Sequence, residues 1–199
     1  MNNLKNVSRE TKNKIEQYVE ILLKWNQKIN LIGKSTESIV WERHIEDCWR
    51  LQEIINNKTE SIVDLGSGAG LPGLLFSLNN YDNVTLIESD LKKTAFLRHI
   101  KGQLNLNTKI IEDRIEKHLD IQYDWVTARA FASLIDILPL AKELLKEEGK
   151  VCLLKGTKIA DEIKEAQQKY LFEFQLIENP NPNFGQIVII SKIEIKKNN

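Results

Sequence analysis

The chain has 199 residues, 42% of them hydrophobic and 28% charged, and its 28 basic residues balance its 28 acidic ones. This length is enough for one α/β core with an accessory element, and the composition is ordinary for a globular protein. A net charge of zero excludes a general attraction to polyanions, so a nucleic-acid partner would require a local basic patch. The cysteines, Cys48 and Cys152, and the three histidines lack metal-ligand spacing, so we expect no metal site.

The first residues, Met1-Asn2-Asn3, lead into a polar, charged stretch without the apolar centre of a secretory signal. No apolar run in the sequence is long enough to span a bilayer. We therefore expect a cytoplasmic protein that has no membrane partner, and we expect it to be a monomer.

Residues 1–58 are predicted to form a helical N-terminal region. A helical pattern begins at Ser8, and apolar residues follow at three- and four-residue spacings: Ile15, Tyr18, Val19, Leu22 and Leu23. The run 31–33 breaks this pattern, and a second helical stretch is expected from about residue 36 to 55. It carries three polar residues close together: Arg43, His44 and Asp47. Such residues either pair with the neighbouring domain or belong to a functional site.

Residues 59–199 are predicted to form a second domain in which strands and helices alternate. Strands are expected at Ile62–Leu65, Val84–Ile87, Lys109–Ile111, Trp125–Ala128, Val151–Leu154, Phe172–Leu176 and Gln186–Ile190. Helices are expected near Leu74–Asn79, Leu91–Gln103, Ile115–Leu119, Leu134–Lys146 and Ile159–Tyr170. The alternation predicts parallel βαβ units, and the turn at 179–182 predicts an antiparallel hairpin at the edge. The expected fold class is α/β, with a mostly parallel seven-stranded sheet.

The loop after the first of these strands is the most informative stretch of the chain. The strand ends at Asp64, and Gly66, Gly68 and Gly70 follow at alternate positions. Glycine tolerates φ > 0 and lets the backbone approach a ligand closely. The start of the following helix offers unpaired N–H groups and the positive end of its dipole. The structural alternative is a glycine-rich turn that binds nothing.

The spacing separates two families of ligand. The dinucleotide fingerprint G-x-G-x-x-G requires glycine where this chain has Leu71. A pyrophosphate gains nothing from the carboxylate of Asp64, whereas the ammonium group of an amino-acid-bearing ligand does. The loop therefore resembles motif I of the S-adenosylmethionine (AdoMet) methyltransferases.

Ligands of open α/β sheets bind at the carboxyl ends of the strands, so the residues that follow each strand are candidates. Glu88 ends the second strand, about twenty residues beyond the loop, where an acid accepts hydrogen bonds from ribose hydroxyls. Ile115 follows the third strand, where an adenine is expected, and Glu116 is a weaker candidate there. The fourth strand runs into Arg129.

The residues after the fourth strand, Ala128-Arg129-Ala130-Phe131, lack two catalytic patterns. There is no Asn/Asp-Pro-Pro-aromatic sequence to orient an exocyclic amine, and no cysteine to attack a pyrimidine. A nucleophile with its own lone pair, such as a purine N7, needs no general base. Proximity and alignment would then supply most of the catalysis.

Several motifs occur together in one order: Lys24-Trp25-Asn26, Arg43-His44-Ile45-Glu46-Asp47, the loop from Val63 to Gly73, Arg129-Ala130-Phe131-Ala132-Ser133-Leu134 and Leu153-Leu154-Lys155-Gly156. Over about residues 10 to 195 the chain resembles the RsmG family, also called GidB. The one departure noticed is Cys48, where many relatives carry serine.

The resemblance implies a Rossmann-like class I AdoMet-dependent fold and methylation of N7 of a guanine in 16S ribosomal RNA. By matching position it implies cofactor contacts at Gly66, Leu71, Ile115, Glu116 and Arg129, with Glu88 on the ribose. It places Arg43, His44, Asp47 and Lys155 near the substrate. One helix carries four basic residues: Lys92, Lys93, Arg98 and Lys101. They are explained equally well as phosphate contacts and as a solvated helix face. The partner that the resemblance implies is 16S ribosomal RNA or a small-subunit assembly intermediate.

Three other functions stay open at this point. An AdoMet-dependent small-molecule methyltransferase is favoured by the zero net charge. An NAD-dependent oxidoreductase would need a glycine at the position of Leu71 and a hydride-handling pair such as Tyr-x-x-x-Lys. A silent RNA-binding module would keep the fold without the activity, although the intact glycines and Glu88 argue against it.

Overall fold

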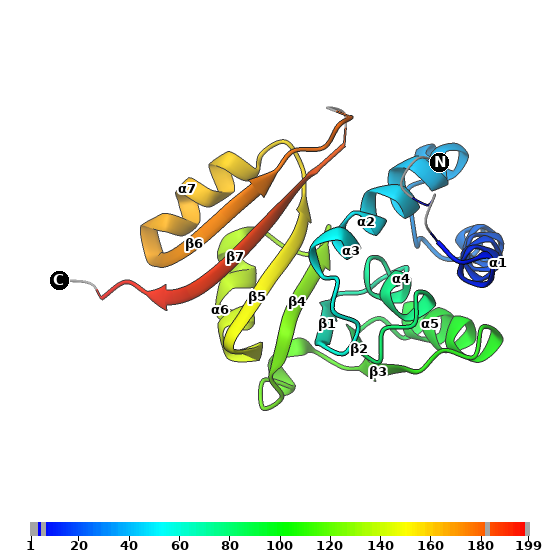
Figure 1. Cartoon of the computed structure of the whole chain (residues 1–199), viewed down its shortest axis with the longest axis horizontal. Helices are drawn as coiled ribbons and strands as arrows, with labels where there is room; N and C mark the ends of the chain where they lie inside the picture. The colour runs from blue at the N-terminus through cyan, green and yellow to red at the C-terminus, as the bar shows by residue number, and fades with distance from the viewer. Residues whose placement is uncertain (1–3, 5–6, 182–183, 198–199) are drawn as a thin grey trace.

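A seven-stranded sheet runs through the computed structural model, which describes residues 4, 7–181 and 184–197 (Figure 1). Its strand order is β3-β2-β1-β4-β5-β7-β6. All pairs are parallel except those of β7, which is antiparallel to both β5 and β6. The predicted α/β fold with an antiparallel edge hairpin is confirmed. Pro182 of the predicted turn lies outside the described residues.

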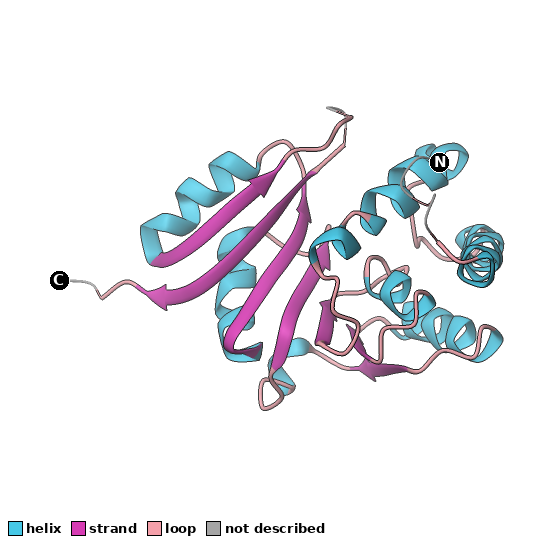
Figure 2. Ribbon diagram, viewed as in Figure 1, coloured by secondary structure: helices cyan, strands magenta, loops and turns pink. Residues whose placement is uncertain are grey.

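The strands lie where β-branched and apolar runs predict them, and each is longer than predicted at one end or at both. They are β1 Ser61–Leu65, β2 Asn83–Glu88, β3 Thr108–Glu112, β4 Tyr123–Arg129, β5 Leu145–Lys155, β6 Tyr170–Ile177 and β7 Gln186–Ile195. The helices between them are α4 Gly73–Leu78, α5 Leu91–Gln103, the short 3₁₀ helix η3 Ile115–Lys117, α6 Leu134–Leu144 and α7 Ile159–Lys169. Figure 2 shows the helices on both faces of the sheet.

The first predicted helix is confirmed as α1, Arg9–Asn26, with the Ser8 hydroxyl accepting a hydrogen bond from the Thr11 amide over 3.1 Å. The second predicted stretch is helical but not one regular helix. It consists of the 3₁₀ helix η1 Lys34–Ile39, the π-helical segment η2 Trp41–Glu46, α2 Asp47–Trp49 and α3 Leu51–Ile54. The wide turn of η2 carries Arg43 and His44, and such turns are common where side chains serve a site.

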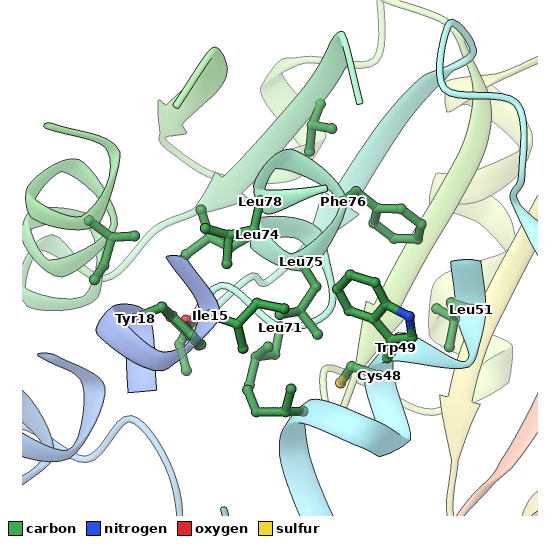
Figure 3. Packing of buried hydrophobic residues seen from close by; sticks show 14 of the residues in the cluster. Ile15, Tyr18, Cys48, Trp49, Leu51, Leu71, Leu74, Leu75, Phe76 and Leu78 are labelled. Atoms are coloured by element: carbon green, nitrogen blue, oxygen red, sulfur yellow. Dashed lines mark hydrogen bonds between the residues drawn. The ribbon is translucent and has the colours of Figure 1, made fainter. Parts of the chain in front are cut away.

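Two apolar clusters fill the faces of the sheet. One lies under α6 and α7, and the other joins the N-terminal region to α4 and α5. Figure 3 shows this second cluster, in which Ile15 of α1 and Trp49 of α2 pack around Leu75 of α4. A shared apolar core therefore crosses the predicted domain boundary at residue 58. The division into two domains stays a prediction.

Among the helices that the structure describes, none is both long and apolar enough to cross a membrane.

Candidate functional site

The glycine loop joins β1 to α4 and adopts a shape that requires its glycines. Gly66, Gly68 and Gly70 have φ values of 60°, 55° and 84°, in the left-handed region that other residues rarely adopt. The Gly70 amide donates to the Ser67 carbonyl over 2.6 Å, which closes the turn. A Cβ at Gly68 would meet only the Gly66 carbonyl oxygen, at 3.8 Å, so the loop is open on this side.

Asp64 lies beneath the loop and is not among the residues that line the three cavities described below. Its side chain is fully buried, and its Oδ1 accepts a hydrogen bond from the Thr127 hydroxyl over 3.0 Å. A Cβ at Gly73 would meet the Asp64 Cβ at 2.8 Å, so glycine permits this close approach. Burial raises the pKa of Asp64 to about 7. The structure thus gives Asp64 a supporting position, whereas the sequence suggested a direct contact with a ligand's ammonium group.

Two cavities adjoin the loop. The first, called the loop cavity, has a volume of about 240 Å³. It lies between the loop and the N-terminal region, and it is lined by Leu31, Ile32, Gly33, His44, Gly66, Ser67, Gly68, Ala69, Leu71, Lys93, Arg129 and Ala130. The turn at 31–33, interpreted from sequence only as a helix breaker, is thus a wall of the site. Nothing local in that segment signals this role.

The second cavity, called the β2 cavity, has a volume of about 220 Å³. It is lined by Gly66, Ile87, Glu88, Ser89, Lys93, Asp113, Arg114, Ile115, Glu116, Ala130 and Phe131. The predicted ribose and adenine residues, Glu88, Ile115 and Glu116, therefore lie together. The two cavities share Gly66, Lys93 and Ala130, so one ligand contacting both would pass the first glycine of the loop.

Glu88 is held by two backbone amides. Its Oε2 accepts a hydrogen bond from the Gly68 amide and its Oε1 from the Asp90 amide, each over 2.8 Å. The carboxylate is therefore fixed between the glycine loop and the start of α5. Each oxygen keeps a lone pair for another donor, which is the arrangement expected for binding a diol.

Phe131 covers the junction between the two cavities. A Cβ added at Gly66 would lie 2.2 Å from the Phe131 Cδ2, so the ring rests directly on this glycine. The ring is nevertheless 37% exposed. The neighbouring Ala130 has a φ of 51° and contributes to both cavities. Both residues belong to a motif in the sequence, but the sequence predicts a role for neither, because their position depends on how the chain turns after β4.

Arg129, at the end of β4, connects the sheet to the N-terminal region. Its guanidinium donates to His44 Nδ1 over 2.5 Å and to Cys48 Sγ over 3.5 Å. Arginine has no acceptor, so His44 Nδ1 accepts and Nε2 carries the proton. That proton points to the Thr36 hydroxyl, 2.7 Å away, which itself donates to the Gly33 carbonyl over 2.7 Å.

A third cavity, called the β5 cavity, has a volume of about 260 Å³ and lies beyond Arg129. It is lined by Arg43, Asp47, Arg129, Ala130, Ala132, Leu154, Lys155, Gly156, Glu162 and Gly185. Arg129 and Ala130 line this cavity and the loop cavity alike. Three of the four predicted substrate residues, Arg43, Asp47 and Lys155, are here, while His44 lies in the loop cavity.

Four charged side chains of the β5 cavity form two ion pairs, Arg43 with Asp47 and Lys155 with Glu162. Asp47 lies 3.7 Å from both Arg43 and Arg50, and its Oδ1 accepts a hydrogen bond from the side-chain amide of Asn179 over 2.9 Å. Burial raises the pKa of Asp47, while Arg129 and the other arginines oppose that shift. The Arg43 guanidinium also lies 5.3 Å from the centroid of the Phe184 ring.

Lys155 is bound to the loop that follows β4. Its Nζ donates to the Ala132 carbonyl over 2.6 Å and to Glu162 Oε2 over 2.8 Å. The same Glu162 oxygen accepts from the Leu134 amide over 2.8 Å, and the Lys155 side chain is only 10% exposed. Glu162, on α7, was not a candidate in the sequence because nothing local marks it. This pair holds residues 132–134 in place.

Of the four basic residues noted on α5, Lys93 lines both the loop and β2 cavities. Arg98 is exposed and pairs with Glu112 over 2.7 Å, while Lys92 and Lys101 are exposed. In the part of the chain that the structure describes, no group of three or more His, Cys, Asp or Glu side chains is placed to hold a metal ion.

The fold is shared with solved structures of other proteins. A putative rRNA-methylase from Clostridium thermocellum superposes with a TM-score of 0.56 at 19% identity, covering 77% of this chain and 97% of that one. A mutant of MtNAS in complex with S-adenosylmethionine gives a TM-score of 0.64 at 12% identity, covering 92% and 76%. At such low identity these likenesses support the fold alone.

Sequence relatives are much closer. Ribosomal RNA small subunit methyltransferase G of Gluconobacter oxydans is 39% identical over 185 residues, which cover 93% of this chain and 95% of that protein. The protein of the same name from Orientia tsutsugamushi strain Ikeda is 42% identical over 171 residues, covering 86% and 85%. The family model GidB, described as rRNA small subunit methyltransferase G, matches residues 11–181. The chain therefore belongs to the GidB family of rRNA small subunit methyltransferases.

Proposed function

We propose that the protein transfers a methyl group from S-adenosylmethionine to N7 of a guanine in 16S ribosomal RNA. The observation that carries this proposal is the adjacency of the three cavities. The loop and β2 cavities share Gly66, and both adjoin the β5 cavity at Ala130. A substrate in the β5 cavity would therefore lie next to a cofactor that is bound along the loop and β2 cavities.

The residues present fit the cofactor. Glu88 has two oriented carboxylate oxygens for the ribose hydroxyls, and Ile115 offers an apolar surface beside them for the adenine. The glycine loop lets the backbone approach the ligand without Cβ atoms. When bound, S-adenosylmethionine supplies an electrophilic methyl group on its sulfonium. Asp64 supports the loop from below, and its direct contact with the cofactor remains our sequence-based expectation.

The side chains around the β5 cavity suit a nucleophile that needs no proton removed. Asp47 is engaged with Arg43, Arg50 and Asn179, and Glu162 is engaged with Lys155. Burial and the charge of Arg129 lower the pKa of His44 to about 3, so this imidazole stays neutral and bound to Arg129 at neutral pH. The N7 lone pair of guanine reacts without a base, so the protein's contribution is to align the two ligands.

We propose 16S ribosomal RNA, naked or in a small-subunit assembly intermediate, as the partner. Because ribosomal RNA is the proposed substrate, the protein would act in the cytoplasm, and we propose that it does so as a monomer. The β5 cavity is lined by three cations, Arg43, Arg129 and Lys155, and by two carboxylates, Asp47 and Glu162. Positive charge is therefore in slight excess there, in a protein of zero net charge.

The test supplies methyl-labelled S-adenosylmethionine with three substrates: naked 16S ribosomal RNA, small subunits from cells that lack this activity, and a pool of cellular metabolites. We expect the label in one RNA nucleotide, at a guanine N7, which is recognised by chain cleavage after borohydride reduction and aniline. Label at another base position would overturn the N7 assignment. Label confined to the metabolite pool would establish the small-molecule alternative instead.

A further inference from the structure

One buried hydrogen bond links α1 to the glycine loop. The Tyr18 hydroxyl donates to the Ala69 carbonyl over 2.8 Å, and the Tyr18 side chain is completely buried. Ala69 stands between Gly68 and Gly70, whose φ values are both positive, and it lines the loop cavity. The hydrogen bond therefore holds a stretch of backbone with left-handed φ values, and it comes from a residue 51 positions away in the sequence.

This hydrogen bond completes the fixation of the peptide unit between Ala69 and Gly70. The amide of that unit, on Gly70, donates to the Ser67 carbonyl over 2.6 Å. The carbonyl, on Ala69, accepts from Tyr18. Two peptide units earlier, between Ser67 and Gly68, the Gly68 amide donates to Glu88 over 2.8 Å. The loop is thus held from three directions: by its own turn, by β2 and by α1.

Tyr18 is itself rigidly placed. Its ring centroid lies 6.4 Å from that of Phe96 on α5, and the Phe96 ring also contacts Trp25 of α1, with centroids 5.6 Å apart. Figure 3 shows Tyr18 beside Ile15, close to Leu71 of the loop and Leu74 of α4. The Tyr18 hydroxyl therefore has a fixed position, and its hydrogen bond fixes the orientation of the Ala69 carbonyl.

We propose that Tyr18 is a positioning residue for the cofactor, acting through Ala69. Glycines lose more conformational freedom on ordering than any other residue, so a loop with three of them binds weakly unless something else orders it first. Tyr18 keeps the loop ordered before the ligand arrives, and this preorganisation strengthens binding. The inference rests on the proposed function in one respect, that the cofactor binds at this loop.

The test is Tyr18→Phe, which removes the hydroxyl and keeps the ring. The chain offers a matched control in Tyr81, another buried tyrosine of the same apolar cluster, whose hydroxyl donates to the Ile55 carbonyl away from the three cavities. Calorimetry would give the dissociation constant of S-adenosylhomocysteine for wild type, Tyr18→Phe and Tyr81→Phe. We expect Tyr18→Phe to weaken binding about three- to tenfold, which corresponds to one ordinary hydrogen bond. Tyr81→Phe should leave the constant within twofold.

Steady-state kinetics and hydrogen exchange separate positioning from general stability. Tyr18→Phe should raise the KM for S-adenosylmethionine with little change in kcat or in the KM for RNA. Without ligand, it should accelerate amide exchange at Gly68 and Gly70 more than Tyr81→Phe does. Equal acceleration in both variants, or an equal loss of affinity, would overturn the inference, because the effect would then be global.

Two further outcomes are decisive. If the wild-type protein does not bind S-adenosylhomocysteine, the proposed function fails, and exchange of the loop amides still tests whether Tyr18 orders the loop. If Tyr18→Phe does not fold, amide exchange in the wild-type protein alone tests the inference. The Gly68 and Gly70 amides must then be protected without ligand, and fast exchange there would refute a preordered loop.

Discussion

The guanidinium of Arg129 donates to Nδ1 of His44 over 2.5 Å, across the boundary between the sheet and the N-terminal region. Because arginine stays charged, a proton on Nδ1 would break this hydrogen bond and bring two positive charges together. Burial, Arg129 and Arg43 accordingly lower the pKa of His44 from 6.5 to about 3. The imidazole thus acts as a neutral bridge and not as an acid.

This relationship predicts a pH-dependent stability. Between about pH 3 and 6.5 the unfolded chain binds a proton at His44 that the folded protein excludes, so this residue's contribution is complete above pH 6.5 and is lost on acidification. The free energy of unfolding of wild type minus that of His44→Gln should fall by up to about 1.4 kcal/mol for each unit by which the pH is lowered within this window. Chemical denaturation at closely spaced pH values measures it.

Asp64→Asn is the opposite case and serves as the control. Burial raises the pKa of Asp64 from 3.8 to about 7, so between these values the folded protein binds a proton that the unfolded chain has lost. Wild type should therefore lose stability relative to Asp64→Asn as the pH rises through this range. If both stability differences changed in the same direction as the pH rises, the two pKa assignments would be contradicted.

Glu88 should be needed for cofactor binding. Hydrogen bonds to a charged group contribute about 1.5–3 kcal/mol, and Glu88 also holds the Gly68 amide. Glu88→Ala should weaken S-adenosylhomocysteine binding by roughly ten- to a hundredfold in calorimetry. Glu112→Ala is the matched control, because Glu112 is the neighbour of Glu88 across β2 and β3 but pairs with the exposed Arg98. An unchanged constant for Glu88→Ala would remove Glu88 from the site.

Gly66→Ala should abolish cofactor binding for two reasons that a second substitution separates. The new Cβ would lie 2.2 Å from the Phe131 ring, and a φ of 60° strains any side chain there. Combining it with Phe131→Ala removes the steric clash but not the strain, so we expect only partial recovery. Gly102→Ala, in α5 with nothing within 4 Å of the added Cβ, should bind normally and be more stable by about 0.5–1 kcal/mol. Full recovery in the double variant would refute the strain argument.

The parts of this fold that sequence analysis predicts correctly carry local signals. The strands follow β-branched runs, and the glycine loop is read from residue spacing alone, because both depend on near neighbours. The bond from Tyr18 to Ala69 spans 51 residues, and Lys155 meets Glu162 only through the packing of α7. Contacts of this kind depend on tertiary packing, which no periodicity encodes. The irregular η2 segment was missed for the same reason, since its side chains bond to residues outside the segment.

Arg43 should hold RNA through a phosphate contact. Each phosphate that a cation neutralises steepens the dependence of log affinity on log salt by a little under one unit. The Arg43 side chain is 34% exposed and lies 3.7 Å from Asp47. Arg43→Ala should therefore weaken RNA binding and flatten the slope by about one phosphate, with cofactor affinity intact. Lys146→Gln is the control, because Lys146 pairs with Asp124 at the start of β4 and should leave the slope unchanged.

Lys155 should behave differently, although the resemblance placed it with Arg43 near the substrate. Its ammonium group is almost buried and already bonded to Glu162 and to the Ala132 carbonyl, so it is not free to exchange a counterion for a phosphate. We expect Lys155→Ala to lower kcat by releasing residues 132–134 while keeping the wild-type salt slope. Glu162→Gln, which weakens the same pair from the other side, should reproduce that loss. A flattened slope in Lys155→Ala, with Glu162→Gln unaffected, would show instead that Lys155 leaves Glu162 to bind RNA.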